Sequence, residues 1–205
     1  MQKGETMKYE ITEEAEKALE YCKKCERENT CFTEGAVIRT LTGKYIDVAN
    51  PHPDMICIQD IAEGLAYNYR FGGLFKNKVT IAEHSIDVYI YTMGLLESLK
   101  LDQSITELVS SLMHDASEAY IRDIPSPIKR FLTDYVALED KLMSCIAYKY
   151  GFDWPVSAVV KKADGICLKM EWLNNLSQKP TLVYKSSAAK RSWLDMLERY
   201  ININN

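Results

Sequence analysis

Two histidines of this chain stand beside carboxylates in segments with helical periodicity. His84 follows Glu83, and His114 precedes Asp115. Imidazole nitrogens and carboxylate oxygens together suit first-row divalent metal ions, and such sites leave open positions for water and substrate. Adjacent residues on a helix point about 100° apart, so His114 and Asp115 reach one ion only in a cleft between helices. The sequence therefore predicts a metal centre to which other helices also contribute.

Asp164 is the fourth member of the predicted ligand set. It lies on an otherwise apolar helical face, and a buried carboxylate costs on the order of several kcal/mol unless it is paired or binds a metal. Each residue has an ordinary alternative, because a lone His on an apolar face is usually a core or surface residue and an Asp often pairs with a neighbour. The combination favours metal binding. The ions that stay open are Mn, Fe, Co, Ni, Zn and Mg, and the predicted ligands are His84, His114, Asp115 and Asp164.

This ordered set resembles the HD-domain phosphohydrolases, whose pattern is H…HD…D on a bundle of helices. The resemblance is closest to the 5′-deoxynucleotidase branch and its phage relatives, which include deoxynucleoside triphosphate triphosphohydrolases acting on dATP. It spans about Val37 to Trp172. The strings that carry it are Arg70-Phe71, Ala82-Glu83-His84-Ser85, His114-Asp115-Ala116-Ser117-Glu118-Ala119, Asp123-Ile-Pro-Ser-Pro-Ile-Lys129 and Lys162-Ala163-Asp164.

Glu118 is the predicted acid/base residue. It follows His114 by one helical turn, so its carboxylate should project from the same face and exchange a proton with attacking water or a leaving oxygen. The resemblance assigns a matching Glu that role, and the alternative is a solvent-facing helical Glu. A bound divalent ion would polarise a phosphoryl oxygen and acidify its water. These features together predict hydrolysis of a phosphate ester.

Substrate-binding candidates surround the predicted ligands. Arg70 offers a planar guanidinium suited to bidentate phosphate binding, and the family's matching Arg contacts substrate. Phe71 occupies the position where related deoxynucleotidases carry a Trp that packs on the sugar, so the preference between deoxyribose and ribose stays open. Asp123 resembles a family Asp that helps position substrate, although an Asp before a turn is often a cap. Weaker candidates are Lys129, Lys78 and Glu171.

Composition limits the function classes. The chain of 205 residues is 47% hydrophobic and 26% charged, which predicts one domain with a proper core. A net charge of -4 argues against binding to a nucleic-acid polymer, which needs many Lys and Arg residues, but allows a nucleotide as a small-molecule partner. No apolar run is long enough to span a bilayer, so we expect a cytoplasmic protein without membrane contact. Assembly into a homo-oligomer stays open.

Six cysteines are interpreted as thiols, because disulfide frameworks belong to oxidising compartments. Three of them are grouped and could form a zinc knuckle, but no fourth ligand stands nearby. The grouped residues are Cys22, Cys25 and Cys31; the others are Cys57, Cys145 and Cys167.

The elements that must position these residues form an all-α bundle with a small N-terminal hairpin over 37–48. Pro51 to Asp54 is predicted as a loop, and its His52 as a residue that does not bind metal. Asp102 is a candidate N-cap for the helix over 101–119. Residues 1–32 are interpreted as a helical extension, 33–178 as the core and 179–205 as the C-terminal helix of a single domain. Helices are predicted over 12–28, 58–69, 79–99, 101–119, 133–150, 156–173 and 187–200, with a break at 123–128.

Several functions use this chemistry. The favoured one is hydrolysis of deoxynucleoside 5′-phosphates, and the alternatives are release of triphosphate from a deoxynucleoside triphosphate or stepwise dephosphorylation. Hydrolysis of a guanosine tetraphosphate alarmone ranks lower, because Ala119 stands where that branch carries a second acidic residue. A non-enzymatic nucleotide-binding regulator is the remaining alternative, and such a protein often lacks a ligand or the acid/base Glu, whereas this chain retains them.

Overall fold

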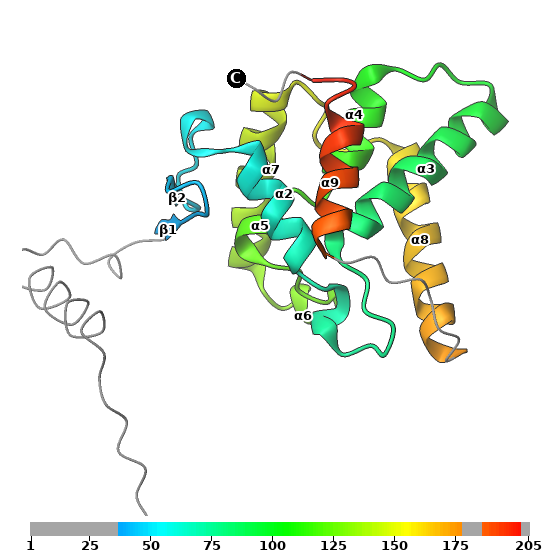
Figure 1. Cartoon of the computed structure of the whole chain (residues 1–205), viewed down its shortest axis with the longest axis horizontal. Coiled ribbons are helices and arrows are strands. Elements are labelled where there is room, and N and C mark those ends of the chain that lie inside the picture. The colour runs from blue at the N-terminus through cyan, green and yellow to red at the C-terminus, as the bar shows by residue number, and fades with distance from the viewer. Residues whose placement is uncertain (1–36, 178–185, 202–205) are drawn as a thin grey trace, which may run out of the picture. The chain divides into compact units, whose positions relative to one another are not determined.

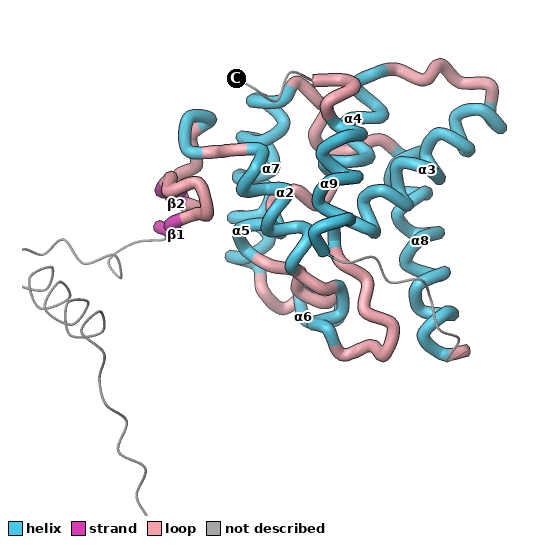
Figure 2. The backbone as a smooth tube through the Cα atoms, viewed as in Figure 1, coloured by secondary structure: helices cyan, strands magenta, loops and turns pink. Residues whose placement is uncertain are grey.

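The computed structural model describes residues 37–177 and 186–201. This part of the chain is mostly helical with one small two-stranded sheet (Figure 2), which confirms the predicted fold class. The helix predicted over 12–28 and the three grouped cysteines lie outside the described residues, and the division at 32 and 178 stays a prediction. The described residues from Ile38 onward belong to one compact unit.

Figure 1 labels the helices and strands of the described part, apart from its two 3₁₀ segments. In chain order the elements are β1 (Val37–Arg39), β2 (Tyr45–Asp47), the 3₁₀ turn η1 (Pro53–Met55), α2 (Ile58–Tyr67), the 3₁₀ segment η2 (Arg70–Gly73), α3 (Ile81–Leu99), α4 (Ile105–Met113), α5 (Glu118–Ile121), α6 (Ser126–Lys129), α7 (Thr133–Tyr150), α8 (Ala158–Leu176) and α9 (Ser186–Leu197).

Most predicted helices lie within about three residues of the observed ones. The prediction over 133–150 matches α7 residue for residue. Helices α3 and α8 each begin two residues later than predicted, because Thr80 and Ser157 are their N-caps. The Thr80 side chain forms a reciprocal capping box with Glu83, and the Ser157 hydroxyl accepts from two backbone N–H groups. Helix α6 begins inside the Pro-rich break, and η1 lies in the predicted 51–54 loop.

The predicted hairpin is present and is tied to α2. The turn between β1 and β2 is closed by a 2.9 Å bond from Thr40 N to Lys44 O, and Gly43 has a φ of 83° that favours glycine. The buried Asp60 carboxylate of α2 accepts from Thr42 N at 2.8 Å and from Thr42 Oγ1 at 2.7 Å. These two bonds hold a three-residue ribbon that is too short to be stable alone.

The single helix predicted over 101–119 is wrong, because α4 ends at Met113 and α5 begins only at Glu118. The His114 ring explains the break. Its Nδ1 lies 2.8 Å from the Ser111 carbonyl, the group that would accept the backbone N–H of Asp115 in a continuing helix. Short i−3 bonds follow, such as Glu118 N to Asp115 O at 3.0 Å. Residues 114–117 therefore form a turn between α4 and α5.

The predicted N-cap of this region is also wrong. Ser104, not Asp102, caps α4 and accepts from Glu107 N at 3.1 Å. Lys100 ends α3 in the left-handed conformation, with a φ of 55°, and residues 101–104 carry the chain to the next helix. An N-cap must directly precede the first helical residue, and Asp102 stands too early.

Helices α3 and α8 lie side by side (Figure 1) and share a small apolar core. Val88 of α3 is buried there with Val160, Ala163 and Cys167 of α8. This packing brings residues about 80 positions apart in the sequence to one place, and it fixes how the polar residues on the same two helices face each other.

The C-terminal α9 packs against α2 and α3. Trp193 is fully buried, and its Nε1 donates to the Leu112 carbonyl of α4 at 3.0 Å. This bond satisfies the indole N–H inside the core. Helix α9 is therefore part of the same core that carries α4.

Helices α2 and α5 approach closely at Gly64. A Cβ at this position would lie 2.6 Å from the Cα, Cβ and carbonyl oxygen of Ala119. Only glycine permits this approach. The contact fixes α5, which begins at Glu118.

Two further expectations bear on chemistry and environment. Cys57, Cys145 and Cys167 are free thiols, as predicted. No helix in the described ranges is both long and apolar enough to cross a membrane.

Candidate metal centre

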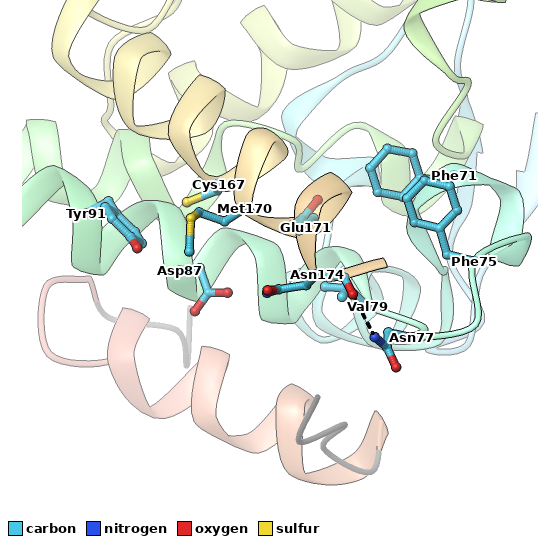
Figure 3. A pocket seen from close by; sticks show the side chains of 10 residues that line it. All are labelled: Phe71, Phe75, Asn77, Val79, Asp87, Tyr91, Cys167, Met170, Glu171 and Asn174. Carbon is cyan, nitrogen blue, oxygen red and sulfur yellow. Dashed lines mark hydrogen bonds between the residues drawn. The ribbon is translucent and has the colours of Figure 1, made fainter. Parts of the chain in front are cut away.

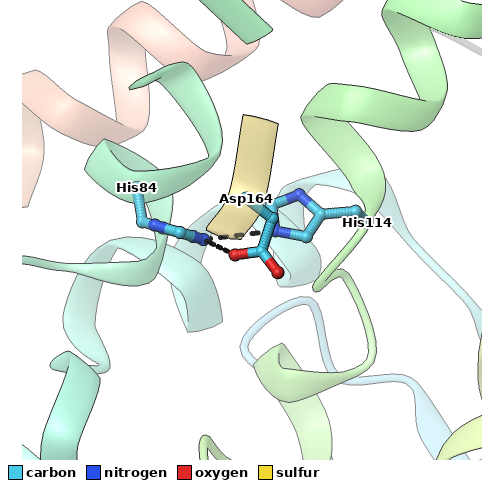
Figure 4. A group of neighbouring side chains, drawn as sticks. All are labelled: His84, His114 and Asp164. Atoms are coloured by element: carbon cyan, nitrogen blue, oxygen red, sulfur yellow. Dashed lines mark hydrogen bonds and ion pairs between the residues drawn. The ribbon is translucent and has the colours of Figure 1, made fainter. Parts of the chain in front are cut away.

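Three predicted ligands converge where α3, the end of α4 and α8 meet. His84 Nε2 lies 3.3 Å from His114 Nε2 and 3.1 Å from Asp164 Oδ1, and one donor atom from each residue lies within 4.8 Å of the others (Figure 4). Both histidines are buried, whereas 42% of the Asp164 side chain is exposed. The cluster is therefore rigid on the imidazole side and open to solvent beside Asp164.

The fourth predicted ligand, Asp115, borders the same cluster. Its Oδ2 lies 3.1 Å from His114 Nε2 and 3.7 Å from His84 Nε2. Both His114 and Asp115 lie in the turn between α4 and α5, and their side chains meet at the cluster. Two imidazole nitrogens and two carboxylates suit a first-row divalent ion, so this group of residues could hold one. Its identity is not fixed by the donors.

Both histidines are held in the tautomer that metal binding needs. His84 Nδ1 lies 2.7 Å from Glu171 Oε1, and His114 Nδ1 lies 2.8 Å from the Ser111 carbonyl oxygen. Carbonyl and carboxylate oxygens only accept hydrogen bonds, so we assign a proton to each Nδ1. In the neutral form of each ring, Nε2 then carries the lone pair and faces the cluster, as in carboxylate–histidine–metal arrangements.

The cluster favours positive charge. Burial and the nearby Arg70 lower the pKa of His84, but hydrogen bonds to Asp164 and Glu171 outweigh them and raise it to about 9. Burial raises the pKa values of Asp115 and Asp164, yet the neighbouring histidines hold both below the usual range. A divalent cation would supply the charge that these carboxylates favour.

Glu118 differs from these ionised carboxylates. It is 5% exposed, and within the described residues its Oε2 is buried without a hydrogen-bond partner. Burial, and then the charges of Asp115 and Asp123, raise its pKa well above the usual value. A buried carboxyl group whose pKa is raised above its usual value can give or take a proton. Its place at the start of α5, rather than along one helix with His114, corrects the predicted geometry.

Arg70 is held against the cluster by two carboxylates. Its Nε donates to Glu171 Oε2 at 2.9 Å, and its Nη1 donates to Asp115 Oδ2 at 3.3 Å. Burial lowers the pKa of Arg70, but Glu171 and Asp115 raise it above the ordinary value. Nη2 makes no hydrogen bond with any residue that the structure describes. The guanidinium therefore stays charged and retains a donor for an anion.

Asp123 supports the backbone beside Arg70. Its Oδ2 accepts from Phe71 N at 3.1 Å, and Phe71 has the left-handed φ of 56°, which is unfavourable for a bulky residue. The Phe71 ring stacks on Phe75 with centroids 4.1 Å apart. Asp123 thus acts as a turn residue for a distant segment, and its substrate contact stays a prediction.

The two lysine candidates and His52 differ in their surroundings. Lys129 Nζ lies 2.5 Å from Glu139 Oε1. Its positive charge partly offsets the rise in the pKa of Glu118. Lys78 Nζ lies over the Tyr69 ring at 5.6 Å and is exposed. His52 is exposed and lies outside the cluster, with its Nδ1 3.4 Å from Asp54 Oδ2.

Glu171, only a weaker candidate from the sequence, contacts two residues of the site. Both of its oxygens are used, one by His84 and one by Arg70, and its side chain is 8% exposed. One signal could have found it, because it follows Asp164 by seven residues and two helical turns place such residues about 20° apart on one face. Glu171 also lines a cavity of about 210 Å³ between α3 and α8, together with Phe71, Phe75 and Asp87 (Figure 3).

Comparisons with known proteins identify an HD domain in this chain. A model of the HD domain matches residues 71–149. An uncharacterized protein of Escherichia coli, YfdR, is 37% identical over 134 residues, which cover 65% of this chain and 69% of the relative. An uncharacterized protein of Rhodobacter capsulatus, RCAP_rcc00048, is 31% identical over 144 residues, with the same coverage. The chain belongs to the HD domain family.

HD domains generally are metal-dependent hydrolases, and membership indicates metal-dependent phosphohydrolase activity. The matched range of the HD domain includes His84, His114 and Asp115 but ends before Asp164 and Glu171. The structure supplies those two carboxylates from α8, where they face the matched helices.

Proposed function

We propose that this HD domain hydrolyses phosphate esters of nucleotides, with deoxynucleoside 5′-phosphates as the first substrate class. The observation that carries the proposal is the charged Arg70 guanidinium held at the edge of the His84, His114, Asp115 and Asp164 cluster. A phosphate that reached the cluster would also meet this guanidinium, which binds phosphate oxygens well.

The proposed ligands are the four clustered residues. A divalent ion bound there would polarise a phosphoryl oxygen and lower the pKa of water. Glu118 Oε2 would accept the proton of the attacking water or give one to the leaving oxygen. Its burial without a partner supports this role, because no neighbouring donor competes for that oxygen among the described residues.

The nucleoside part of the proposal rests on the segment after Arg70. Phe71 and Phe75 form a stacked pair, and Trp172 meets both at an edge. Such an aromatic surface is suited to a sugar or a base. The Asp123 contact to Phe71 N holds the start of this surface beside the cluster.

The direct test incubates the metal-free protein with Mn²⁺, Co²⁺ or Mg²⁺ and a panel of deoxy- and ribonucleotides carrying one or three phosphates. Chromatography then separates phosphate, pyrophosphate and triphosphate. Release of phosphate from monophosphates supports the proposal, and release of intact triphosphate would place the activity with the triphosphohydrolases. Consumption of no nucleotide with any metal would overturn the enzymatic reading and favour a regulator. A Glu118→Gln protein purified by the same procedure controls for contaminating phosphatases.

A further inference from the structure

We propose that Glu171 is a positioning residue that couples the metal-binding histidine His84 to the phosphate-binding Arg70. This inference rests on the proposed function, because it assigns Arg70 to phosphate. Glu171 itself touches neither the ion nor the substrate in the proposal. It acts through the two side chains that do.

The first support is that one carboxylate serves two donors. Glu171 Oε1 lies 2.7 Å from His84 Nδ1, and Oε2 lies 2.9 Å from Arg70 Nε. Charge-assisted bonds of this length are among the stronger ones in proteins. Since each oxygen holds a different partner, neither contact can shift without moving the carboxylate that the other contact needs.

The second support is that the contacts form a closed ring. Arg70 Nη1 lies 3.3 Å from Asp115 Oδ2, which lies 3.7 Å from His84 Nε2. His84 and Asp115 are proposed ligands, and Arg70 is joined to one directly and to the other through Glu171. The position of the guanidinium is therefore set by the metal centre on both sides.

The ring has a thermodynamic consequence. A phosphate that fixes the position of Arg70 also fixes Glu171 and, through it, His84. In the same way, an ion that orders His84 also orders Arg70. Coupling between two binding sites is reciprocal. Metal and phosphate should therefore strengthen each other's binding, and loss of the carboxylate should weaken both.

Glu171→Gln is the sharpest change because it keeps the shape of the side chain. An amide has one oxygen that accepts and an NH₂ group that only donates. It can serve His84 Nδ1 or Arg70 Nε but must set its NH₂ group against the other. The matched control is Glu63→Gln, since Glu63 makes a comparable ion pair with Lys190 at 2.7 Å between α2 and α9.

The experiment titrates the full-length, metal-free protein with Co²⁺, followed by its visible spectrum and by calorimetry. Inorganic phosphate is then titrated into the Co²⁺-saturated protein. We expect Glu171→Gln to weaken Co²⁺ binding about 10–100-fold, the usual cost of losing a residue that orients a metal ligand, and to weaken phosphate binding as well. Glu63→Gln should match the parent in both titrations. In an Arg70→Gln background, Glu171→Gln should still weaken Co²⁺ but cause no further loss of phosphate affinity.

Parental affinity for Co²⁺ and phosphate in a folded Glu171→Gln protein would overturn the inference. If circular dichroism shows that this variant does not fold, Glu171→Asp takes its place, because it keeps the charge and shortens the reach; unchanged affinities in that variant overturn the inference equally. The proposed function fails separately. A parent that hydrolyses no nucleotide can still show the Glu171 effect on Co²⁺ and phosphate binding.

Discussion

The two sides of the centre differ in how completely their polar atoms are engaged. On the α3–α8 side, both nitrogens of His84 and both oxygens of Glu171 have partners within 3.3 Å. The charged form of Glu171 is favoured, because His84 and Arg70 lower its pKa despite its burial. On the α5 side, Glu118 has a buried oxygen without a partner in the described part, and burial raises its pKa. The difference fits the proposal that one side holds charge and that Glu118, on the other, transfers a proton.

The largest expected effect is at Asp115, which belongs to both sides. Asp115→Ala removes a proposed ligand and one of the two carboxylates that hold Arg70. We expect loss of stoichiometric Co²⁺ binding and of nucleotide turnover to the uncatalysed background. Calorimetric titration and product chromatography measure these. Asp102→Ala serves as the control, because Asp102 is exposed and does not cap α4. Equal Co²⁺ affinity in the two variants would remove Asp115 from the ligand set.

The next effect separates proton transfer from metal binding. Glu118→Gln should retain parental Co²⁺ affinity while kcat falls about 10²–10⁴-fold, the usual contribution of a general acid or base. Its thermal midpoint should equal or exceed that of the parent, because the change removes a buried ionisable group whose oxygen lacks a partner. Steady-state kinetics and a thermal melt provide the readings. A lower midpoint together with unchanged kcat would make Glu118 a structural residue.

A smaller effect tests whether α5 is held in place by packing. Gly64→Ala would force a Cβ to 2.6 Å from the Ala119 backbone, so we expect a loss of about 1–3 kcal/mol in the free energy of unfolding. Because α5 begins with Glu118, kcat should fall while Co²⁺ affinity is kept. The matched control is Gly94→Ala in α3, which has nothing within 4 Å and should gain up to about 1 kcal/mol. Equal stabilities of the two variants in urea unfolding would contradict the close approach.

The smallest effect concerns the histidine outside the centre. His52→Ala should leave Co²⁺ stoichiometry and turnover unchanged and lower the free energy of unfolding by about 1 kcal/mol or less, because its exposed ring caps η1 only through a 3.4 Å bond from Asp54 N. Calorimetry and urea unfolding measure both. A fall in metal stoichiometry would show that the cluster of His84 and His114 is incomplete.

Most of the described helices and the kinds of ligand could be predicted from the sequence alone. The helix predicted at about 133–150, after the Pro-containing break, agrees with α7, because local residue types decide where a helix is interrupted. The residue types and order of His84, His114, Asp115 and Asp164 were enough to predict a metal centre, and the structure brings them together.

The orientation of these residues could not be predicted, because it depends on contacts between elements. The end of α4 at Met113 depends on a side chain that takes a backbone carbonyl from the helix, and periodicity carries no record of that competition. Glu171 contacts partners 87 and 101 positions away in the sequence. Glu118 Oε2 lacks a partner among the described residues because of how the neighbouring elements pack around it. Contacts over such distances arise from how helices pack, whereas the sequence pattern reports only what each segment prefers.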